Sequence, residues 1–175
     1  MLFRSDVDAG HPYIVAKGIR PFGSKQLRDS LLIPVRGADG ELRGIQFIGR
    51  DGGKKFKTGT EISGGYHSIG RPKNKTLLVC EGWATGCSLH EATGYAVAVA
   101  FNAGNLLPVC EELRAKYPFW RLIVCADDDQ ATPSNPGITK GAAAARVVGA
   151  LLAVPDFAGV ERGTGDTDFN DLLAK

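Results

Sequence analysis

Acidic residues follow two apolar segments in the second half of the chain, at the point where each segment ends. Glu81 comes directly after residues 76–80 (TLLVC), and Asp127 and Asp129 follow residues 122–126 (LIVCA). If both segments are parallel strands, their carboxyl ends meet at one edge of a sheet and bring these side chains together. Clustered carboxylates repel one another unless a cation neutralises them, and carboxylates are preferred ligands of Mg²⁺. The spacing therefore predicts a Mg²⁺ or Mn²⁺ site that uses these three residues.

A third acidic group near the C-terminus is less sharply placed. We assign Asp168 as a further metal ligand, with Asp166 and Asp171 as alternatives. In phosphoryl chemistry such ions orient the attacking oxygen and stabilise charge on the leaving one, so the acidic groups favour a phosphoryl-transfer enzyme. Each acidic motif alone is more typical of a helix N-cap or a solvated loop. Their combination, each after an apolar strand, is what favours a catalytic site.

The segments around these acids alternate between strand and helix patterns after residue 75. Short apolar runs predict strands, and longer mixed segments that stop at Gly or Pro predict helices. The predicted strands are residues 76–80, 96–100, 122–126 and 153–157, and the predicted helices are residues 84–93, 106–117 and 138–152. Alternation of this kind implies an α/β fold with a parallel sheet and helices on both faces.

The first part of the chain has the pattern of a small antiparallel β-rich subdomain. Residues 31–35 and 42–48 flank a turn and predict a hairpin. Residues 54–57 predict a third strand, with Phe56 facing a core and the lysines facing outward. Residues 59–74, rich in Gly and polar residues, predict a connecting loop.

Charge divides the chain in the same way. Residues 1–75 contain 14 Lys and Arg against 7 Asp and Glu, whereas residues 76–175 contain 7 against 12. We therefore expect a basic β subdomain at residues 1–75 and a catalytic subdomain at residues 76–175. A basic part joined to an acidic part favours a phosphate-rich partner held beside a metal, although an unevenly charged solvated surface fits charge alone equally well.

Basic residues before Glu81 are candidates for contacts with a nucleic-acid backbone, because phosphate contacts require charge rather than base recognition. The candidates are Arg43, Arg50, Lys54, Lys55 and Lys57. The alternative is that lysines protect an edge strand from aggregation. Lys140 stands at the start of the predicted helix after the acidic loop, which suits a nucleotide triphosphate and equally suits an ordinary helix start.

Composition disfavours several other classes of protein. Apolar runs fall short of the roughly 20 residues that span a bilayer, and the first ten residues carry no export signal, so we expect a cytoplasmic protein without a membrane partner. The four cysteines form no CxxC pair and the three histidines are scattered, so neither a zinc site nor a Ser-His-Asp triad is predicted. Cys80, Cys125, Trp83 and Trp120 are predicted to be core residues.

The acidic motifs and several phrases around them resemble a known family. Glu81-Gly82 after one apolar strand and Asp127-Asp128-Asp129 after another resemble the Toprim domain of primases, topoisomerases and some nucleases. The phrases HPYIVAKGI, LLIPV, GELRGIQFI, GGKKF, EGWATGCSL, ADDD and TDFNDL resemble plasmid and phage primases or primase-helicases, in the same order. The resemblance runs from about residue 11 to residue 173 and implies a Rossmann-like Toprim fold.

The resemblance also implies roles for residues. It assigns acid/base work in nucleotidyl transfer to Glu81 and Mg²⁺ binding to Asp127 and Asp129. Many of these primases carry Asp a few residues after the Glu-Gly pair, where this chain has Thr85. The pattern therefore departs from the family at one expected metal contact.

Together these features predict the catalytic core of a DNA primase, which makes RNA primers on a single-stranded DNA template from nucleoside triphosphates. Glu81 would act as general base or as the ligand of a second ion, and the resemblance suggests a replicative helicase or a zinc-binding module as partner. A Toprim-type nuclease with the same metal is one alternative. A nucleic-acid-binding domain without catalysis is the other, although the complete set of carboxylates argues against a decayed site.

Overall fold

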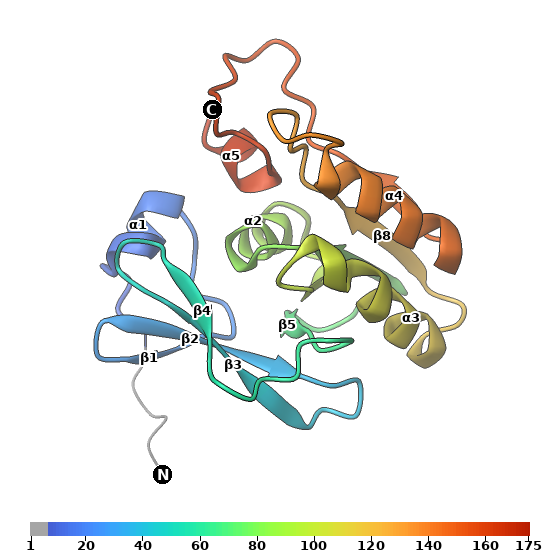
Figure 1. Cartoon of the computed structure of the whole chain (residues 1–175), viewed down its shortest axis with the longest axis horizontal. Coiled ribbons are helices and arrows are strands. Elements are labelled where there is room, and N and C mark those ends of the chain that lie inside the picture. Colours follow the sequence, from blue (N-terminus) through green and yellow to red (C-terminus); the bar gives the residue numbers. More distant parts are fainter. Residues whose placement is uncertain (1–6) are drawn as a thin grey trace.

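The structure of the chain, a computed structural model, describes residues 7–175 and contains two β-sheets (Figure 1). The first sheet has the strand order β1-β2-β3-β4, and the second has the order β5-β7-β6-β8-β9. Residues 1–6 lie outside the described residues. They include part of the segment in which we expect no export signal and part of the predicted basic subdomain.

The first sheet is antiparallel throughout. Its strands are β1 (Lys25–Leu27), β2 (Ser30–Arg36), β3 (Leu42–Ile48) and β4 (Lys54–Phe56). The three predicted strands are confirmed as β2, β3 and β4, whereas β1 is a three-residue edge strand too short to carry a periodic signal. A short helix, α1 (Pro12–Lys17), precedes the sheet and was not predicted; its N-cap His11 accepts a hydrogen bond from the Tyr13 backbone N–H.

The second sheet holds the parallel strands. They are β6 (Thr76–Cys80), β7 (Ala96–Val99), β8 (Arg121–Cys125) and β9 (Leu151–Ala153), and β5 (His67–Ile69) pairs antiparallel with β7 at one edge. Because side chains alternate along each strand, Leu78 and Val97 pack toward one face while Leu77 and Ala98 pack toward the other.

Helices cover both faces of this sheet. On one face α2 (Trp83–Thr93) packs in a core shared with α1 and the first sheet, and on the other face lie α3 (Leu106–Lys116) and α4 (Pro136–Val148). A 3-10 turn, η1 (Ala103–Asn105), leads into α3. The predicted α/β fold, with a parallel sheet between helices and a separate antiparallel sheet before it, is confirmed.

Several boundaries differ from the prediction. The helix expected at residues 138–152 ends at Val148, because Gly149 adopts a left-handed conformation with φ of 61°. Residues after Gly149 form β9 (Leu151–Ala153). The strand expected at residues 153–157 therefore begins before residue 153 and ends at Ala153. The expected loop at residues 59–74 contains β5, which joins the second sheet although it precedes residue 76. The boundary between residues 75 and 76 stays a prediction.

The core contains the residues that were expected there. Cys80 and Cys125 are buried, Trp83 is 1% exposed, and Trp120 is partly buried against the α3 and α4 core. In the described part of the chain, no helix is long and apolar enough to cross a membrane.

Candidate active site

Glu81 lies between the end of β6 and the start of α2, where Gly82 is the N-cap. Burial raises the pKa of Glu81 to about 7, and the nearby charge of Asp129 adds to this effect. Lys140 and a hydrogen bond from the Ala103 backbone N–H act in the opposite direction. One carboxylate oxygen, Oε1, is buried without a hydrogen-bond partner. A carboxyl with a pKa near neutrality suits proton transfer at ordinary pH.

Asp127 follows β8, which is the direct neighbour of β6 in the sheet. Burial raises the pKa of Asp127 to about 8, and the negative charge of Glu81 is the next largest cause, followed by Asp168 and Asp129. Its Oδ1 atom is also buried without a partner. Two strand ends thus bring together carboxylates that lie 46 positions apart in the sequence, and the charge of Glu81 raises the pKa of Asp127.

The loop after Asp127 is fixed by hydrogen bonds to its own side chains. Asp129 accepts a hydrogen bond at 3.0 Å from the backbone N–H of Gly137, in the first turn of α4. Asn135 accepts from the backbone N–H of Asp129 at 2.9 Å and donates to Asp128. Asp128 also forms an ion pair with Arg162 at 2.6 Å, which holds its pKa below the usual value. The sequence reasoning missed Arg162, because nothing in the local pattern indicates a partner 34 residues away.

Asp168 is the C-terminal acid that lies near the other carboxylates. It raises the pKa of both Glu81 and Asp127, whereas Asp171 forms an ion pair with Lys17 and Asp166 forms one with Lys175. Asp168 is the N-cap of α5 (Phe169–Leu173), so its Oδ1 accepts from the Asp171 backbone N–H.

Thr85 supplies the second hydrogen bond of Asp168. The Thr85 hydroxyl is buried in α2 and donates to Asp168 Oδ2 at 2.7 Å. This is the position at which the expected pattern has Asp. The contact was not predicted, because it joins residues 83 positions apart.

The donor set has the chemistry of a site for a hard divalent cation. Glu81 and Asp127 each present a buried oxygen without a hydrogen-bond partner. The negative charges of Asp129 and Asp168 raise the pKa of both. Within residues 7–175, no group of three or more His, Cys, Asp and Glu side chains is close enough together to hold an ion as it stands. The residue types and the two buried oxygens without a partner therefore fit Mg²⁺ or Mn²⁺.

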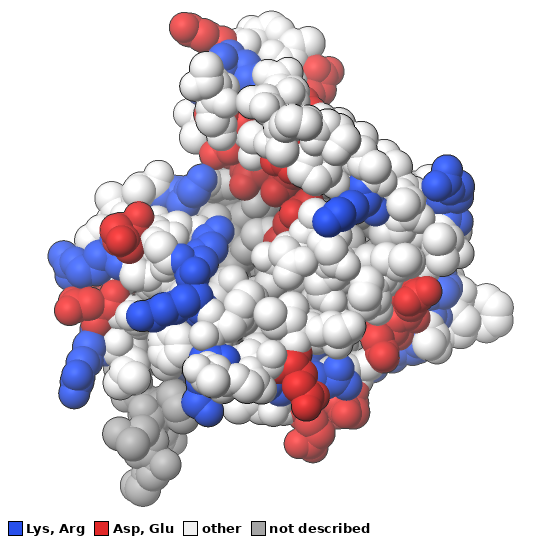
Figure 2. All heavy atoms as spheres, viewed as in Figure 1, with Lys and Arg blue, Asp and Glu red and all other residues white. Residues whose placement is uncertain are grey.

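Two lysines from different elements lie near the carboxylates. Lys54, on β4, has a lowered pKa, chiefly because surrounding protein desolvates it and also because Lys17 is near, although Asp168 and Asp127 raise it. The side chain still reaches solvent, and its ammonium lies 6.0 Å from the centroid of the Tyr13 ring. Lys140, near the start of α4, lowers the pKa of Glu81. Figure 2 shows acidic side chains inside a hollow, with basic side chains on its rim.

Strand alternation places Lys54 and Lys55, two of the three lysines predicted to bind nucleic acid, on opposite faces of β4. Lys54 lies on the same face of β4 as Phe56, whose ring contacts Phe101 at a centroid distance of 5.6 Å. Lys55 lies on the other face. All three lysines are exposed and Phe56 is partly buried, as expected, although Lys54 shares a face of β4 with Phe56.

The two predicted arginines have acidic partners outside the four proposed metal ligands. Arg50 forms an ion pair with Asp29 at 3.3 Å, and Arg43 lies 4.0 Å from Asp39. Both pairs are at least partly exposed, and such pairs contribute little to stability.

The chain was compared with known protein families, and residues 76–175 match the family model of the Toprim domain. The chain belongs to the Toprim family. The predicted resemblance is thereby confirmed, and the Toprim match contains all four carboxylates, Glu81, Asp127, Asp129 and Asp168.

Curated relatives of this Toprim chain include two proteins named DNA primase TraC from Escherichia coli. One is 35% identical over 158 residues, which is 84% of this chain and 15% of the relative. The other is 34% identical over 161 residues, which is 86% of this chain and 11% of the relative. The chain thus spans a small part of each relative, and the matched part includes residues before the Toprim domain.

Solved structures share the fold. The primase fragment of the bacteriophage T7 primase-helicase protein has a TM-score of 0.60 at 15% identity, covering 98% of this chain and 75% of that chain. A chain from the structure of bacteriophage T7 lagging-strand DNA polymerase with primase domains has a TM-score of 0.59 at 16% identity. The match covers 91% of this chain and 83% of that chain. Since both antiparallel and parallel sheets fall within the 98% that is covered, the likeness extends to the arrangement of the two parts.

Proposed function

We propose that this Toprim chain is the catalytic core of a DNA primase, which joins ribonucleotides on a single-stranded DNA template in a metal-dependent reaction. The observation that carries the proposal is the pair Glu81 and Asp127, two neighbouring carboxylates with strongly raised pKa values and unpartnered buried oxygens, beside Lys54 and Lys140. The similarity to proteins named DNA primase supports it.

In this proposal Asp127, Asp129 and Asp168 would hold a divalent ion, Mg²⁺ or Mn²⁺. When bound, the ion supplies positive charge that neutralises the carboxylates and orients the triphosphate. Glu81 is the general base: it accepts the proton of the attacking ribose hydroxyl as that oxygen bonds to the α-phosphorus and pyrophosphate leaves. A second role for Glu81, as ligand of another ion, remains within the same proposal.

The lysines have separate parts in the proposed reaction. Lys54 and Lys140 lie near the carboxylates and would bind the phosphates of the incoming nucleotide or of the adjacent template. Lys55, on the other face of β4, and Lys57, directly after this strand, would contact the flanking template, together with Arg43 and Arg50. A replicative helicase or a zinc-binding module is the partner we propose, and the cytoplasm is the compartment.

Primer synthesis by the purified chain tests the proposal. With a single-stranded DNA template, ribonucleoside triphosphates and Mn²⁺ or Mg²⁺, the wild-type chain should make short primers. Glu81→Gln keeps the shape of the side chain but removes the base, so synthesis should fall by about a hundredfold or more while DNA binding stays the same. The exposed Glu111→Gln, on α3, is the matched control and should retain synthesis.

Two results would contradict the primase proposal. Metal-dependent cutting of the template without synthesis, abolished by Glu81→Gln, would favour a nuclease. Equal primer synthesis by the wild type and Glu81→Gln would show that Glu81 is not the general base.

A further inference from the structure

The end of the parallel sheet opposite the carboxylates is strongly basic. Two segments reach this end, residues 70–79 before and within β6 and residues 113–126 between α3 and the acidic loop. Together they contain six Lys and Arg residues and no Asp or Glu: Arg71, Lys73, Lys75, Arg114, Lys116 and Arg121. The five residues of β6, at roughly 3.3 Å each, separate this end from Glu81 by about 17 Å.

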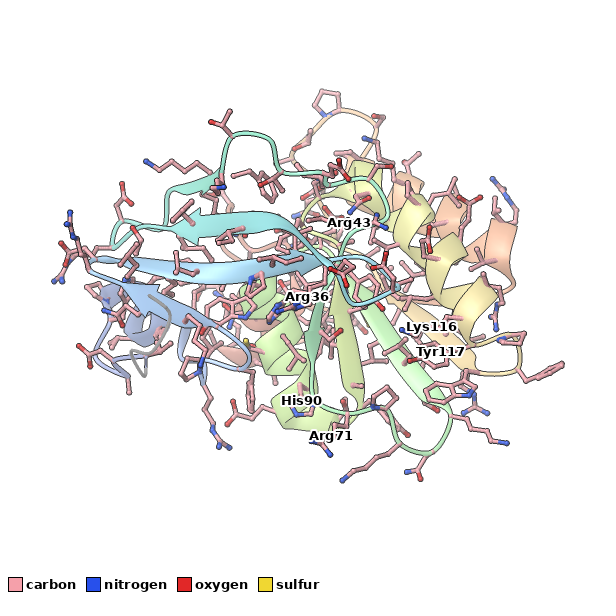
Figure 3. The ribbon with its side chains drawn as sticks, turned by 90° about the horizontal axis from the view of Figure 1, so that it is seen from below. Arg36, Arg43, Arg71, His90, Lys116 and Tyr117 are labelled. Atoms are coloured by element: carbon pink, nitrogen blue, oxygen red, sulfur yellow. The ribbon has the colours of Figure 1, made fainter. Side chains whose placement is uncertain are left out.

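Backbone contacts bring the two basic segments side by side. The Arg121 backbone N–H donates to the Lys75 carbonyl at 2.8 Å, and Lys73 forms a β-bridge with Thr76. A cavity of about 120 Å³ is lined by Pro72 together with Lys116 and Tyr117. Figure 3 shows Arg71, Lys116 and Tyr117 on the same side of the molecule. Lys73, Lys75 and Arg121 are exposed, and the ion pairs found within residues 7–175 involve other side chains.

A turn held by hydrogen bonds presents an aromatic side chain two residues before Arg121. Phe119 is 92% exposed. The turn that carries it is held by Arg114, whose guanidinium donates to the carbonyls of Tyr117, Pro118 and Trp120 and also to the carbonyls of Val148 and Gly149 at the end of α4. Tyr117 and Trp120 stack at a centroid distance of 4.2 Å beneath the turn.

This arrangement has an energetic cost in the isolated chain, because an exposed Phe ring leaves apolar surface in water. It has an advantage for binding, because the turn is already fixed and little conformational entropy is lost when a ligand stacks on the ring. Exposed cations beside an aromatic ring are the combination with which proteins bind single-stranded nucleic acid, the cations contacting phosphates and the ring stacking on a base.

We propose that this surface, formed by Phe119, Lys73, Lys75 and Arg121, binds a single-stranded nucleic acid. It is a second contact, separate from the proposed catalytic site, and it does not depend on primer synthesis. An acidic protein segment would satisfy the cations but would leave the Phe119 ring without a matching flat partner, so the ring favours nucleic acid.

Fluorescence provides a local measurement of this binding. The chain has two tryptophans, Trp83, which is 1% exposed, and Trp120, which lies beside Phe119 in the sequence. Oligothymidylate of about twelve nucleotides, within the roughly 4–16 nucleotides that such surfaces cover, should quench the emission of Trp120. Trp120→Phe should remove this signal, which identifies its source.

Two variants then test the residues of the surface. Phe119→Ala should weaken the binding detected through Trp120 by about fivefold or more, because it removes a stacking partner. The triple variant Lys73→Gln, Lys75→Gln, Arg121→Gln should reduce the slope of log affinity against log salt by about 2, since each phosphate contact on a single strand contributes roughly 0.7. Leu42→Ala, which removes an apolar side chain that is 53% exposed on β3, is the matched control and should change neither quantity.

Defined outcomes overturn the proposal. Unchanged quenching and an unchanged salt slope in both surface variants would exclude this surface, and circular dichroism of each variant establishes that it is folded. Quenching of Trp120 by a polyglutamate peptide but not by oligothymidylate would assign the surface to an acidic protein instead. Neither result bears on primer synthesis, which is measured separately with Glu81→Gln.

Discussion

The position of a single carboxylate, Asp168, depends on one side chain that was not expected in this role. Thr85 donates a hydrogen bond to Asp168 at 2.7 Å from a fully buried position in α2. An Asp at position 85, as in the expected pattern, would place a second negative charge there and would repel Asp168 in the absence of a cation. The threonine therefore orients Asp168 and removes one charge from the cluster.

Thr85→Val tests this orientation. Valine has nearly the same shape but no hydroxyl, so Asp168 loses a donor, and we expect the free energy of unfolding to fall by about 1.5–3 kcal/mol. Urea denaturation of the metal-free chain measures the change. Thr85→Ser keeps the hydroxyl and should lose clearly less; equal losses for Val and Ser would mean that packing of the threonine methyl, rather than the hydrogen bond, is responsible.

At the scale of elements, the acidic loop and α4 fit closely together at Gly137. The backbone N–H of Gly137 donates to Asp129, and a Cβ atom at this position would collide with the backbone oxygen of Asp127. Asn135, the N-cap of α4, accepts from the Ile138 backbone N–H. The start of α4 is thus fixed against the segment that carries two of the proposed metal ligands.

Gly137→Ala measures how tightly these elements are joined. Alanine normally stabilises a helix relative to glycine, yet here the added methyl group must push α4 away from the loop, so we expect a destabilisation of about 1–3 kcal/mol in urea denaturation. Gly165→Ala is the control, because a Cβ there meets no atom within 4 Å, and it should change stability by less than about 0.5 kcal/mol. A higher free energy of unfolding for Gly137→Ala would show that the loop moves aside at little energetic cost.

At the scale of the whole molecule, acidic and basic residues gather at opposite ends of the parallel strands. Carboxylates gather at the carboxyl ends of β6 and β8, facing the first sheet, while basic residues gather where these strands begin. The carboxylates are close enough to repel, so folding without a cation brings negative charges together in a partly desolvated place. Stability should therefore depend on pH.

The sign follows from the pKa values. In the folded chain the pKa of Glu81 rises from 4.5 to about 7 and that of Asp127 from 3.8 to about 8. The folded state therefore holds more protons than the unfolded state between about pH 4 and pH 8, and these two groups make the chain less stable as pH rises through this range. His67, whose pKa is lowered from 6.5 by burial, has the opposite effect near its own pKa.

A comparison with Asp127→Asn isolates the carboxylates, because His67 is common to both proteins. Between about pH 6 and pH 8.5 the melting temperature of the metal-free wild type should fall by several degrees relative to that of the variant. Mn²⁺ at millimolar concentration should restore the wild type at high pH and affect the variant less. Parallel pH profiles for the two proteins would contradict the raised pKa of Asp127.

The sequence by itself determined the elements whose signals are local. The apolar segments of β2, β3, β6, β7 and β8 each have a strand pattern with turn residues at the ends, and α2 and α3 stop at Gly94 and near Pro118. The alternation of strands and helices then predicted the α/β fold class. Because acids directly follow β6 and β8, the approach of Glu81 and Asp127 to one another also followed from the sequence.

Only the tertiary structure decided features that depend on distant partners. β5 is three residues long and exists because it pairs with β7, some 30 positions later, and β9 likewise depends on β8. Asp168, rather than Asp166 or Asp171, acts on the pKa of Glu81, while Lys175 and Lys17 pair with the other two. Such contacts leave no periodic trace in the sequence, since the interaction energy that selects them arises only when the chain is folded.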